Sequence, residues 1–372
     1  MRIFKHCCCG EVLTLKKIWI LFIFPAITAC IFLLSGTSAA EKTARITLSL
    51  LNPVKAVRYV LSADSASAPP FFPHNNSTEQ ENPFEDFELN KPPKADNTPP
   101  PPSDTPYPIV PLTYTPVQND VTYKRQNCYI KNVTDYPRAE VETELLAPLD
   151  FKIEKNSSSP QILIMHTHAT ESYQNHDGLY YDPAYTCRDT DTTRNMVSVG
   201  KIIAEKLNDL GYNTLQDTTL HDYPNYNGSY DRSKVTVESY LAKYPSIKVV
   251  LDVHRDAIER TDGTRIKPVV TINGKPCAQV MIISGADNGY LNMPNYKKNL
   301  RFASHFQNSM ETLYPGFTRP ILFDYRNYNQ QLTTGSLLIE VGGHANTLEE
   351  AQNSALLIAN SLAHTFDSLQ QH

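Results

Sequence analysis

The sequence predicts an α/β fold in which a mostly parallel or mixed sheet is flanked by helices. Short, uninterrupted apolar runs recur along residues 125–372, and such runs are typical of buried strands. Between them lie segments whose apolar residues repeat at helical spacing. Strands that alternate with helices favour a layered α/β architecture. We therefore expect one domain over residues 125–372.

Four apolar runs are expected to be strands of this sheet. They are Ile162–Met165, Val249–Val253, Val280–Ile283 and Leu337–Val341. None shows the strict apolar–polar alternation of a half-exposed strand. Continuous apolar runs fit strands whose two faces are both covered, as in parallel sheets.

Two helices are marked by their termini as well as by their periodicity. The first would end at Gly211, and its apolar positions are Met196, Val199, Ile203, Leu207 and Leu210. The second would begin with a capping box formed by Thr347 and Glu350. Its inner face would consist of Ala351, Ala355, Ile358 and Leu362.

The N-terminus predicts export. Residues 1–17 form a basic stretch that is expected to stay in the cytoplasm, and residues 18–36 form a transmembrane anchor or signal segment. The uncharged run Ile18–Leu34 has a length between those of a signal-peptide core and a short membrane span. We expect an uncleaved anchor, with cleavage at the small residues Ser38–Ala40 as the alternative. In both cases the domain that follows, with any chemistry it performs, would lie outside the cytoplasm.

Residues 37–124 are expected to be a proline-rich disordered linker. Residues 53–120 contain 15 of the chain's 27 prolines, together with polar tracts that cannot bury much apolar surface. Proline-rich chains favour extended conformations, so the linker would hold the following domain away from the membrane.

Composition argues against several classes of protein. The formal net charge is −5 and no strongly basic stripe occurs, so no nucleic-acid partner is expected. Beyond the first apolar run only Cys128, Cys187 and Cys277 remain, with no CxxC spacing. This pattern is neither a disulfide framework nor a thiolate zinc site. Cys187 has no obvious partner base, which argues against a cysteine peptidase.

Polar residues gather at the ends of three predicted strands. The first strand runs into a segment that contains His166, His168 and Glu171, the second ends at His254, and the fourth contains Glu340. In open α/β sheets, ligands bind at the carboxyl ends of the strands. We therefore expect a functional site where these three strand ends meet.

These residue types predict a catalytic Zn²⁺ site. Catalytic zinc takes three nitrogen or oxygen ligands from the protein and keeps one position for water. His166 and His168 are two residues apart, so a continuing strand would point both to one face. Glu171 would join them if the chain turns, and His254 would complete the site. The sequence leaves open which of His166, His168 and Glu171 bind the metal.

Glu340 is the predicted general base. It lies inside an apolar strand, where an unpaired carboxylate is costly, so a specific electrostatic role is expected. In the hydrolysis of an amide, it would take a proton from the zinc-bound water as this water attacks the amide carbonyl. It would then return the proton to the departing amine. Arg255 is the second catalytic candidate, and it would orient Glu340 or a ligand carboxylate, or polarise the scissile carbonyl. Gly342 and Gly343 would let the backbone approach a substrate.

Each of these residues alone also has a structural interpretation. A single strand-end histidine is more often a satisfied polar residue than a ligand, and Glu340 alone could form an ion pair with Arg255. The joint occurrence at three strand ends favours a metal site. Four further histidines are interpreted as bystanders or supporting residues: His176, His221, His305 and His344.

Five motifs resemble those of the stage II sporulation protein P family. In chain order they are His166–Tyr173 (HTHATESY), Asp252–Ala257 (DVHRDA), Tyr328–Leu332 (YNQQL), Gly335–Gly343 (GSLLIEVGG) and Asn346–Ala351 (NTLEEA). Because several long motifs occur in the expected order, the resemblance is specific. It covers roughly residues 155–365.

The resemblance implies a fold and an activity similar to those of zinc N-acetylmuramoyl-L-alanine amidases. The substrate would be peptidoglycan, with stem peptides split from glycan strands and with endopeptidase activity on cross-links. The implied setting is forespore engulfment during sporulation, with the stage II sporulation proteins D and M as partners. Two alternatives stay open: a zinc peptidase that cuts stem peptides only, and a non-enzymatic wall-binding scaffold.

The resemblance also implies roles for individual residues. The first zinc histidine of the amidases falls on His168 or His166, their second on His254, and their catalytic glutamate on Glu340. Their zinc glutamate usually begins the first long helix, where this chain has Asn195. Glu171 is the expected substitute.

Overall fold

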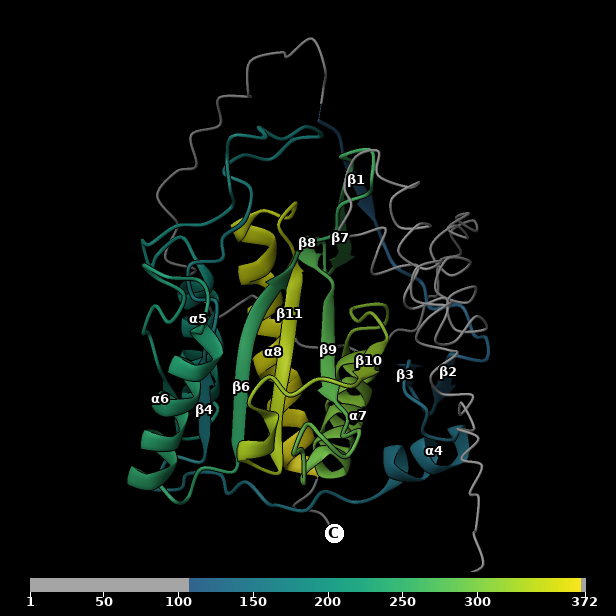
Figure 1. Ribbon diagram of the computed structural model, residues 1–372, viewed down its shortest axis with the longest axis vertical. Helices are drawn as coiled ribbons and strands as arrows, with labels where there is room; N and C mark the ends of the chain where they lie inside the picture. The colour runs from purple at the N-terminus through teal and green to yellow at the C-terminus, as the bar shows by residue number, and fades with distance from the viewer. Residues whose placement is uncertain (1–106, 369–372) are drawn as a thin grey trace, which may run out of the picture. The chain divides into compact units, whose positions relative to one another are not determined.

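The computed structural model describes residues 107–368, which are built on an eight-stranded sheet (Figure 1). From edge to edge its strands are β2 (Thr122–Arg125), β3 (Cys128–Asn132), β10 (Ile321–Asp324), β9 (Val280–Gly285), β11 (Gly335–Gly343), β6 (Val249–Asp256), β4 (Ile162–Met165) and β5 (Thr214–Gln216). The pairs β2–β3 and β9–β11 are antiparallel, and the other neighbours are parallel. The predicted mixed sheet is confirmed.

A second, three-stranded sheet consists of β1 (Ile109–Leu112), β7 (Arg265–Ile272) and β8 (Lys275–Ala278), in that order. The helices are α4 (Arg138–Leu146), α5 (Met196–Asp209), α6 (Ser229–Lys243), α7 (Tyr296–Leu313) and α8 (Leu348–Ser368), with a 3-10 turn η1 at Gln330–Leu332. Among the residues described here, no helix is long and apolar enough to cross a membrane.

Helices cover both faces of the large sheet, which explains the continuous apolar runs. Along β4, Ile162 and Ile164 join the main core together with α5, whereas Leu163 and Met165 pack with Val237 of α6. Alternate residues of a strand point to opposite faces, so α5 and α6 lie on opposite sides of β4. Figure 1 shows α8 (yellow) passing behind β6 and β11.

The predicted helix ends are confirmed in detail. Thr347 and Glu350 form the capping box of α8: the Glu350 amide donates to Thr347 Oγ1 at 3.2 Å, and the Thr347 amide donates to Glu350 Oε2 at 3.1 Å. At the other predicted helix, the Asn195 side chain accepts a hydrogen bond from the Val197 amide and caps α5. Gly211 follows α5 with a φ of +88°, which favours glycine.

The boundary predicted between linker and domain is wrong for residues 107–124. This stretch contains β1, which pairs in parallel with β7, and the start of β2. Its prolines were the reason for expecting disorder. Pro111 lies in β1, an edge strand of the smaller sheet, and edge strands tolerate proline because one side of the strand makes no ladder hydrogen bonds. The predictions for residues 1–17, 18–36 and 37–106 lie outside the described residues.

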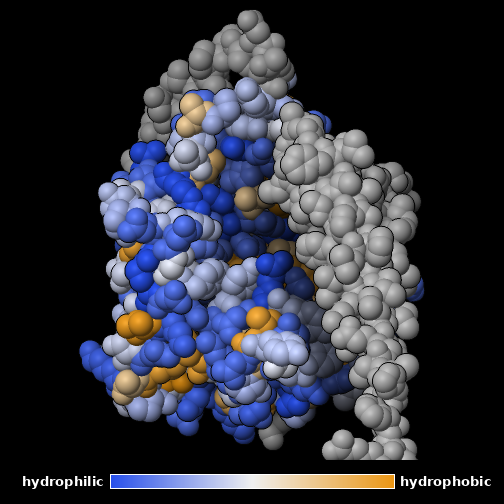
Figure 2. Space-filling view, viewed as in Figure 1, coloured by the Kyte–Doolittle hydropathy of each residue, from blue (hydrophilic) through white to orange (hydrophobic). Residues whose placement is uncertain are grey.

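The visible surface is polar, and the cysteines form no disulfide framework within residues 107–368. The face in Figure 2 is mostly hydrophilic, and its apolar residues form small, separate patches. Cys128, Cys187 and Cys277 are all buried and free. Burial raises the pKa of the Cys128 and Cys277 thiols to about 12, so these groups stay protonated at neutral pH.

Candidate active site

The strand register brings His254 and Glu340 together. His254 of β6 lies directly opposite Glu340 of β11 in a parallel pair, so both side chains start from the same face of the sheet. His168 follows the carboxyl end of the neighbouring strand β4. Its ring lies edge-on to that of His254, with 5.2 Å between the ring centroids. The predicted meeting of three strand ends therefore occurs.

Glu171 joins these residues and is ionised. Its Oε2 lies 3.5 Å from His254 Nδ1, and its Oε1 lies 3.7 Å from Arg255 Nη1 and 3.6 Å from Arg188 Nη2. Burial raises the pKa of Glu171, but the nearby Arg255 and the His254 imidazole outweigh that effect and hold it at about 2. The carboxylate is thus available as an anionic ligand.

Asp252 holds the other edge of the His254 ring. The distance from His254 Nε2 to Asp252 Oδ1 is 2.7 Å. Asp252 also accepts hydrogen bonds from the Thr167 amide at 2.8 Å and from Thr167 Oγ1 at 2.7 Å. Burial lowers the pKa of His254, but the Asp252 and Glu171 carboxylates raise it well above its ordinary value. The sequence analysis did not assign a role to Asp252, although its two-residue spacing from His254 signals a shared face.

The structure does not bring His166 into this cluster. The strand ends at Met165 and the chain turns at residues 167–170, so the alternation that would have aligned the two histidines is lost. Both His166 ring nitrogens are engaged: Nδ1 lies 2.9 Å from the Val253 carbonyl and Nε2 lies 3.2 Å from Gln216 Nε2. Burial lowers the pKa of His166 to about 4, which keeps the ring neutral. This histidine has a structural environment.

Glu340 has the environment expected of a general base. Its Oε2 atom is buried and has no hydrogen-bond partner within residues 107–368. Burial, and then the Asp256 carboxylate, raise the pKa of Glu340 to about 8. A carboxylate whose pKa lies near neutrality can both accept and return a proton during turnover. This carboxyl group is therefore better matched to proton transfer than the ionised Glu171.

An ion pair that the sequence did not reveal lies near Glu340. Arg319 Nη1 contacts Asp256 Oδ2 at 2.8 Å, and the two groups act in opposite directions on the pKa of Glu340. Arg319 lies in the loop before β10, outside the three motif-bearing strands, and it is only 5% exposed. No sequence motif marked it.

Arg255 lies behind Glu171. Its Nε donates to the Ser172 carbonyl at 2.9 Å, its Nη2 donates to the Cys187 carbonyl at 2.8 Å, and its remaining nitrogen faces Glu171. Of the roles predicted for Arg255, the geometry fits the orientation of a ligand carboxylate. Because the guanidinium is buried in these contacts, the predicted roles toward Glu340 and the scissile carbonyl are not supported.

The glycine turn after Glu340 is required for packing within the protein. Gly342 has a φ of +66°, and a Cβ atom there would lie 2.5 Å from Asn346 Oδ1 and 2.7 Å from Ala278 Cβ. Asn346 Oδ1 also accepts the Gly343 amide hydrogen bond at 2.8 Å. Glycine is thus required for the close packing of this turn, whereas the sequence analysis attributed it to the approach of a substrate.

The donor types in the site fit zinc, although the side chains do not already form a ligand cage. His168, His254 and Glu171 supply two imidazoles and an ionised carboxylate, the kinds of donor that catalytic zinc takes. In residues 107–368, however, no group of three or more His, Cys, Asp or Glu side chains is arranged to hold a metal ion. His168 Nε2 lies 3.1 Å from the Tyr226 hydroxyl, and His254 Nε2 faces Asp252. Metal binding through His168 Nε2 would require the Tyr226 contact to be exchanged. His254 can instead use Nδ1, which faces Glu171, and keep its contact with Asp252.

Tyrosines from the loop before α6 and from its first turn surround His168. The Tyr226 ring stacks on His168 with 4.6 Å between centroids, and Tyr230 lies edge-on at 5.4 Å. Tyr230 in turn stacks on Tyr328, a residue of the YNQQL motif. The sequence showed a loop rich in tyrosine and asparagine here but gave no reason to place it over His168.

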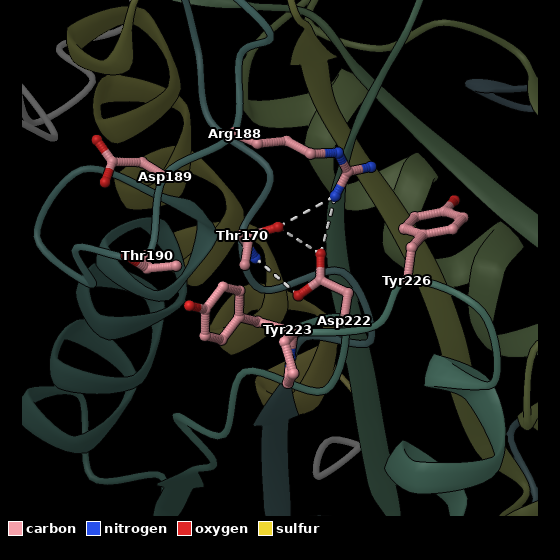
Figure 3. A pocket seen from close by; sticks show the side chains of 8 residues that line it. Thr170, Arg188, Asp189, Thr190, Asp222, Tyr223 and Tyr226 are labelled. Atoms are coloured by element: carbon pink, nitrogen blue, oxygen red, sulfur yellow. Dashed lines mark hydrogen bonds and ion pairs between the residues drawn. The ribbon is translucent and has the colours of Figure 1, made fainter.

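Tyr226 also lines a cleft of about 540 Å³, whose side chains are drawn in Figure 3. It is lined by Thr170, Arg188, Asp189, Thr190, Asp222, Tyr223, Pro224 and Tyr226. Arg188 connects the cleft to the site, because it contacts Glu171 as well as Asp222. The buried Asp222 carboxylate supports the cleft wall.

Comparison with known proteins gives the family. The family model described as Stage II sporulation protein P matches residues 75–363. The chain belongs to this family. A curated relative, Stage II sporulation protein P of Bacillus subtilis (strain 168), is 31% identical over 219 residues, which cover 56% of this chain and 50% of the relative. The match thus spans about half the length of that relative.

Solved structures of amidases are similar to parts of this chain. N-acetylmuramoyl-L-alanine amidase AmiC2 of Nostoc punctiforme matches with 13% identity and a TM-score of 0.33, over 58% of this chain and 99% of that one. The CwlD amidase from Clostridioides difficile, in complex with the GerS lipoprotein, matches with 10% identity and a TM-score of 0.35, over 57% and 98%.

Proposed function

We propose that this protein is a zinc-dependent peptidoglycan hydrolase, an N-acetylmuramoyl-L-alanine amidase that acts in forespore engulfment during sporulation. The observation that carries the proposal is Glu340, whose Oε2 atom is buried, whose pKa is raised to about 8 and which lies directly opposite His254. Membership of the Stage II sporulation protein P family supports the sporulation setting.

His168, His254 and Glu171 would hold the zinc ion. When bound, the ion would supply Lewis-acid polarisation of the amide carbonyl. Arg255 keeps the Glu171 carboxylate in place, and Asp252 fixes the His254 ring, so the donors are positioned by charged partners.

Glu340 would carry the proton through the reaction. Its carboxylate takes a proton from water as the water oxygen bonds to the carbonyl carbon of the lactyl–L-alanine amide. It then delivers that proton to the alanine nitrogen as the C–N bond breaks. The products are a lactyl carboxylate on the sugar and a stem peptide with a new N-terminal alanine.

The proposal includes a location and partners. The basic N-terminus and the apolar segment at residues 18–36 would anchor the chain in the membrane with the catalytic domain outside the cytoplasm. The stage II sporulation proteins D and M would be its partners, and cross-link endopeptidase activity would accompany amide cleavage. These parts depend on the sequence resemblance and on the N-terminal pattern.

The decisive experiment is product analysis after incubation of the full chain, loaded with zinc, with purified peptidoglycan. New N-terminal alanine beside intact glycan strands supports the amidase. New diamino-acid termini without new alanine would replace it with a zinc peptidase. Binding to peptidoglycan with no product, unchanged by chelation, would indicate a scaffold.

A further inference from the structure

The cleft that Tyr226 lines is next to the candidate active site. The Tyr226 ring forms part of the cleft wall and stacks on His168, while the Arg188 guanidinium lies 4.8 Å from the centroid of the same ring. A ligand in the cleft would therefore meet the same tyrosine that stacks on His168. The cleft has the size of a small-ligand pocket, in the range of about 300–1,000 Å³.

The only cationic side chain among the lining residues is already neutralised. Arg188 Nη1 contacts Asp222 Oδ2 at 2.8 Å and Thr170 Oγ1 at 3.1 Å, and its Nη2 faces Glu171 Oε1 at 3.6 Å. Figure 3 shows the contacts of Arg188 with Thr170 and Asp222 as dashed lines. The lining also has two carboxylates: Asp222 pairs with this guanidinium, and Asp189 pairs with Arg194 at 3.3 Å. An acidic ligand would find no spare positive charge.

The Asp222 carboxylate serves the wall rather than a ligand. Its side chain is fully buried, and it accepts hydrogen bonds from the Thr170 amide at 3.1 Å and from Thr170 Oγ1 at 2.6 Å, besides its ion pair with Arg188. The arginine and the buried aspartate thus form a fixed part of the cleft wall. The groups that remain to meet a ligand are those on its rim.

The rim combines aromatic and hydroxyl-bearing side chains. Tyr223 is 59% exposed and Tyr226 is 51% exposed, so both rings can meet a ligand. Thr190 is also exposed, and Asp189 is partly exposed. Aromatic faces and hydrogen-bonding groups without net positive charge suit a neutral, hydroxylated ring with apolar C–H faces.

We propose that this cleft binds a neutral amino-sugar ring of the glycan strand, with Tyr223 as its main contact surface. The inference rests on the proposed function, and it assigns the glycan side of the scissile amide to the cleft that Tyr226 and Arg188 line. The stem peptide, which carries carboxylates, would then leave the site in another direction.

Binding can be measured apart from hydrolysis by using the full chain with Glu340→Gln. Two probes are titrated calorimetrically: a neutral tetrasaccharide of N-acetylglucosamine, and a free stem peptide. We expect the tetrasaccharide to bind and Tyr223→Ala to weaken its binding by about 10-fold, while Tyr223→Phe, which keeps the ring, retains most of the affinity. The affinity for the stem peptide should not change with Tyr223→Ala.

Tyr290→Ala is the matched control, because Tyr290 is a 93% exposed tyrosine that does not line the cleft. It should leave the binding of both probes unchanged. The proposal is overturned if the tetrasaccharide does not bind, if Tyr290→Ala weakens it as much as Tyr223→Ala, or if Tyr223→Ala weakens the stem peptide instead. Since no hydrolysis is measured, a failure here leaves the amidase test intact, and an inactive enzyme leaves this test intact.

Discussion

The two histidines of the His166-Thr-His168 turn differ completely in their surroundings. His166 lies against α5, where both of its ring nitrogens have partners and its pKa is lowered to about 4 by burial. His168 lies under Tyr226, beside His254, in a cluster of ionised and aromatic groups. Identical residue types two positions apart thus belong to a structural and to a candidate catalytic environment.

The difference teaches how a functional polar cluster can be distinguished from a structural one. Around His166 the polar groups satisfy one another. Around His168 and His254, two carboxyl groups have pKa values displaced in opposite directions, Glu171 downward and Glu340 upward. Such displacements at a strand-end cluster are typical of functional sites.

The largest expected effect is that of Glu340→Gln on turnover. Loss of the proton carrier should reduce the release of N-terminal alanine by about 100-fold or more. Zinc content, measured by elemental analysis, should stay near that of the parent, because a base rather than a ligand is removed. Full activity of Glu340→Gln would refute its assignment as the base.

Replacement of either histidine should separate metal binding from folding. His168→Ala should lower zinc occupancy and activity. It should change the free energy of unfolding of the metal-free protein little, since this residue lies in the candidate active site beneath a loop. His166→Ala should lower that free energy by about 2–4 kcal/mol, because it leaves a cavity and unpaired polar groups. Denaturant unfolding measures the free energy of unfolding, and elemental analysis measures the zinc content. The comparison fails if His166→Ala releases zinc and His168→Ala does not.

Gly200→Ala tests the close packing on His166. A Cβ atom at Gly200 would lie 2.4 Å from His166 Nε2, in the middle of α5. We expect a loss of about 1–3 kcal/mol in the free energy of unfolding, as for other overpacked interiors. Gly178→Ala is the control, because its nearest neighbour would be the His176 side chain at 3.3 Å. Equal stabilities of the two variants would contradict the tight packing.

The last prediction concerns the effect of pH on the stability of the metal-free protein. Since the pKa of Glu171 is depressed to about 2, its stabilising contribution is present above its ordinary value, about 4.5, and is lost as the pH falls toward 2. Since the pKa of Glu340 is raised to about 8, its contribution is present below about 4.5 and is lost as the pH rises toward 8. Glu171→Gln should therefore flatten the acid limb of stability, and Glu340→Gln should stabilise the protein above pH 8. Urea unfolding measured across this pH range tests both expectations. An unchanged acid limb in Glu171→Gln, or no gain of stability above pH 8 in Glu340→Gln, would contradict them.

Much of the fold could be predicted from the sequence because its signals are local. Strands such as Ile162–Met165 and Val280–Ile283 have enough consecutive apolar residues to be recognised alone, and the Thr347–Glu350 capping box marks the start of α8. The pairing of β1 with β7 could not be predicted. It joins residues 156 positions apart, and Pro111 in β1, with the prolines around it, indicates disorder unless the edge position of the strand is known.

The candidate site was predictable only as far as strand ends determine it. His254 and Glu340 lie opposite each other because both belong to parallel strands with recognisable registers. His166 was misplaced because a single residue decides where β4 ends. Arg319 and Tyr226 come from loops, whose positions over the sheet depend on contacts with no sequence periodicity.

The pairing of β11 has a practical consequence for protein engineering. Glu340 is fixed by backbone partners on both sides, His254 of β6 and Met281 of β9, so the direction of its side chain is determined by main-chain hydrogen bonds. Position 340 can therefore be given other acids, amides or imidazoles without rebuilding the scaffold. A one-residue insertion earlier in β11 would instead turn the side chain toward the opposite helical layer.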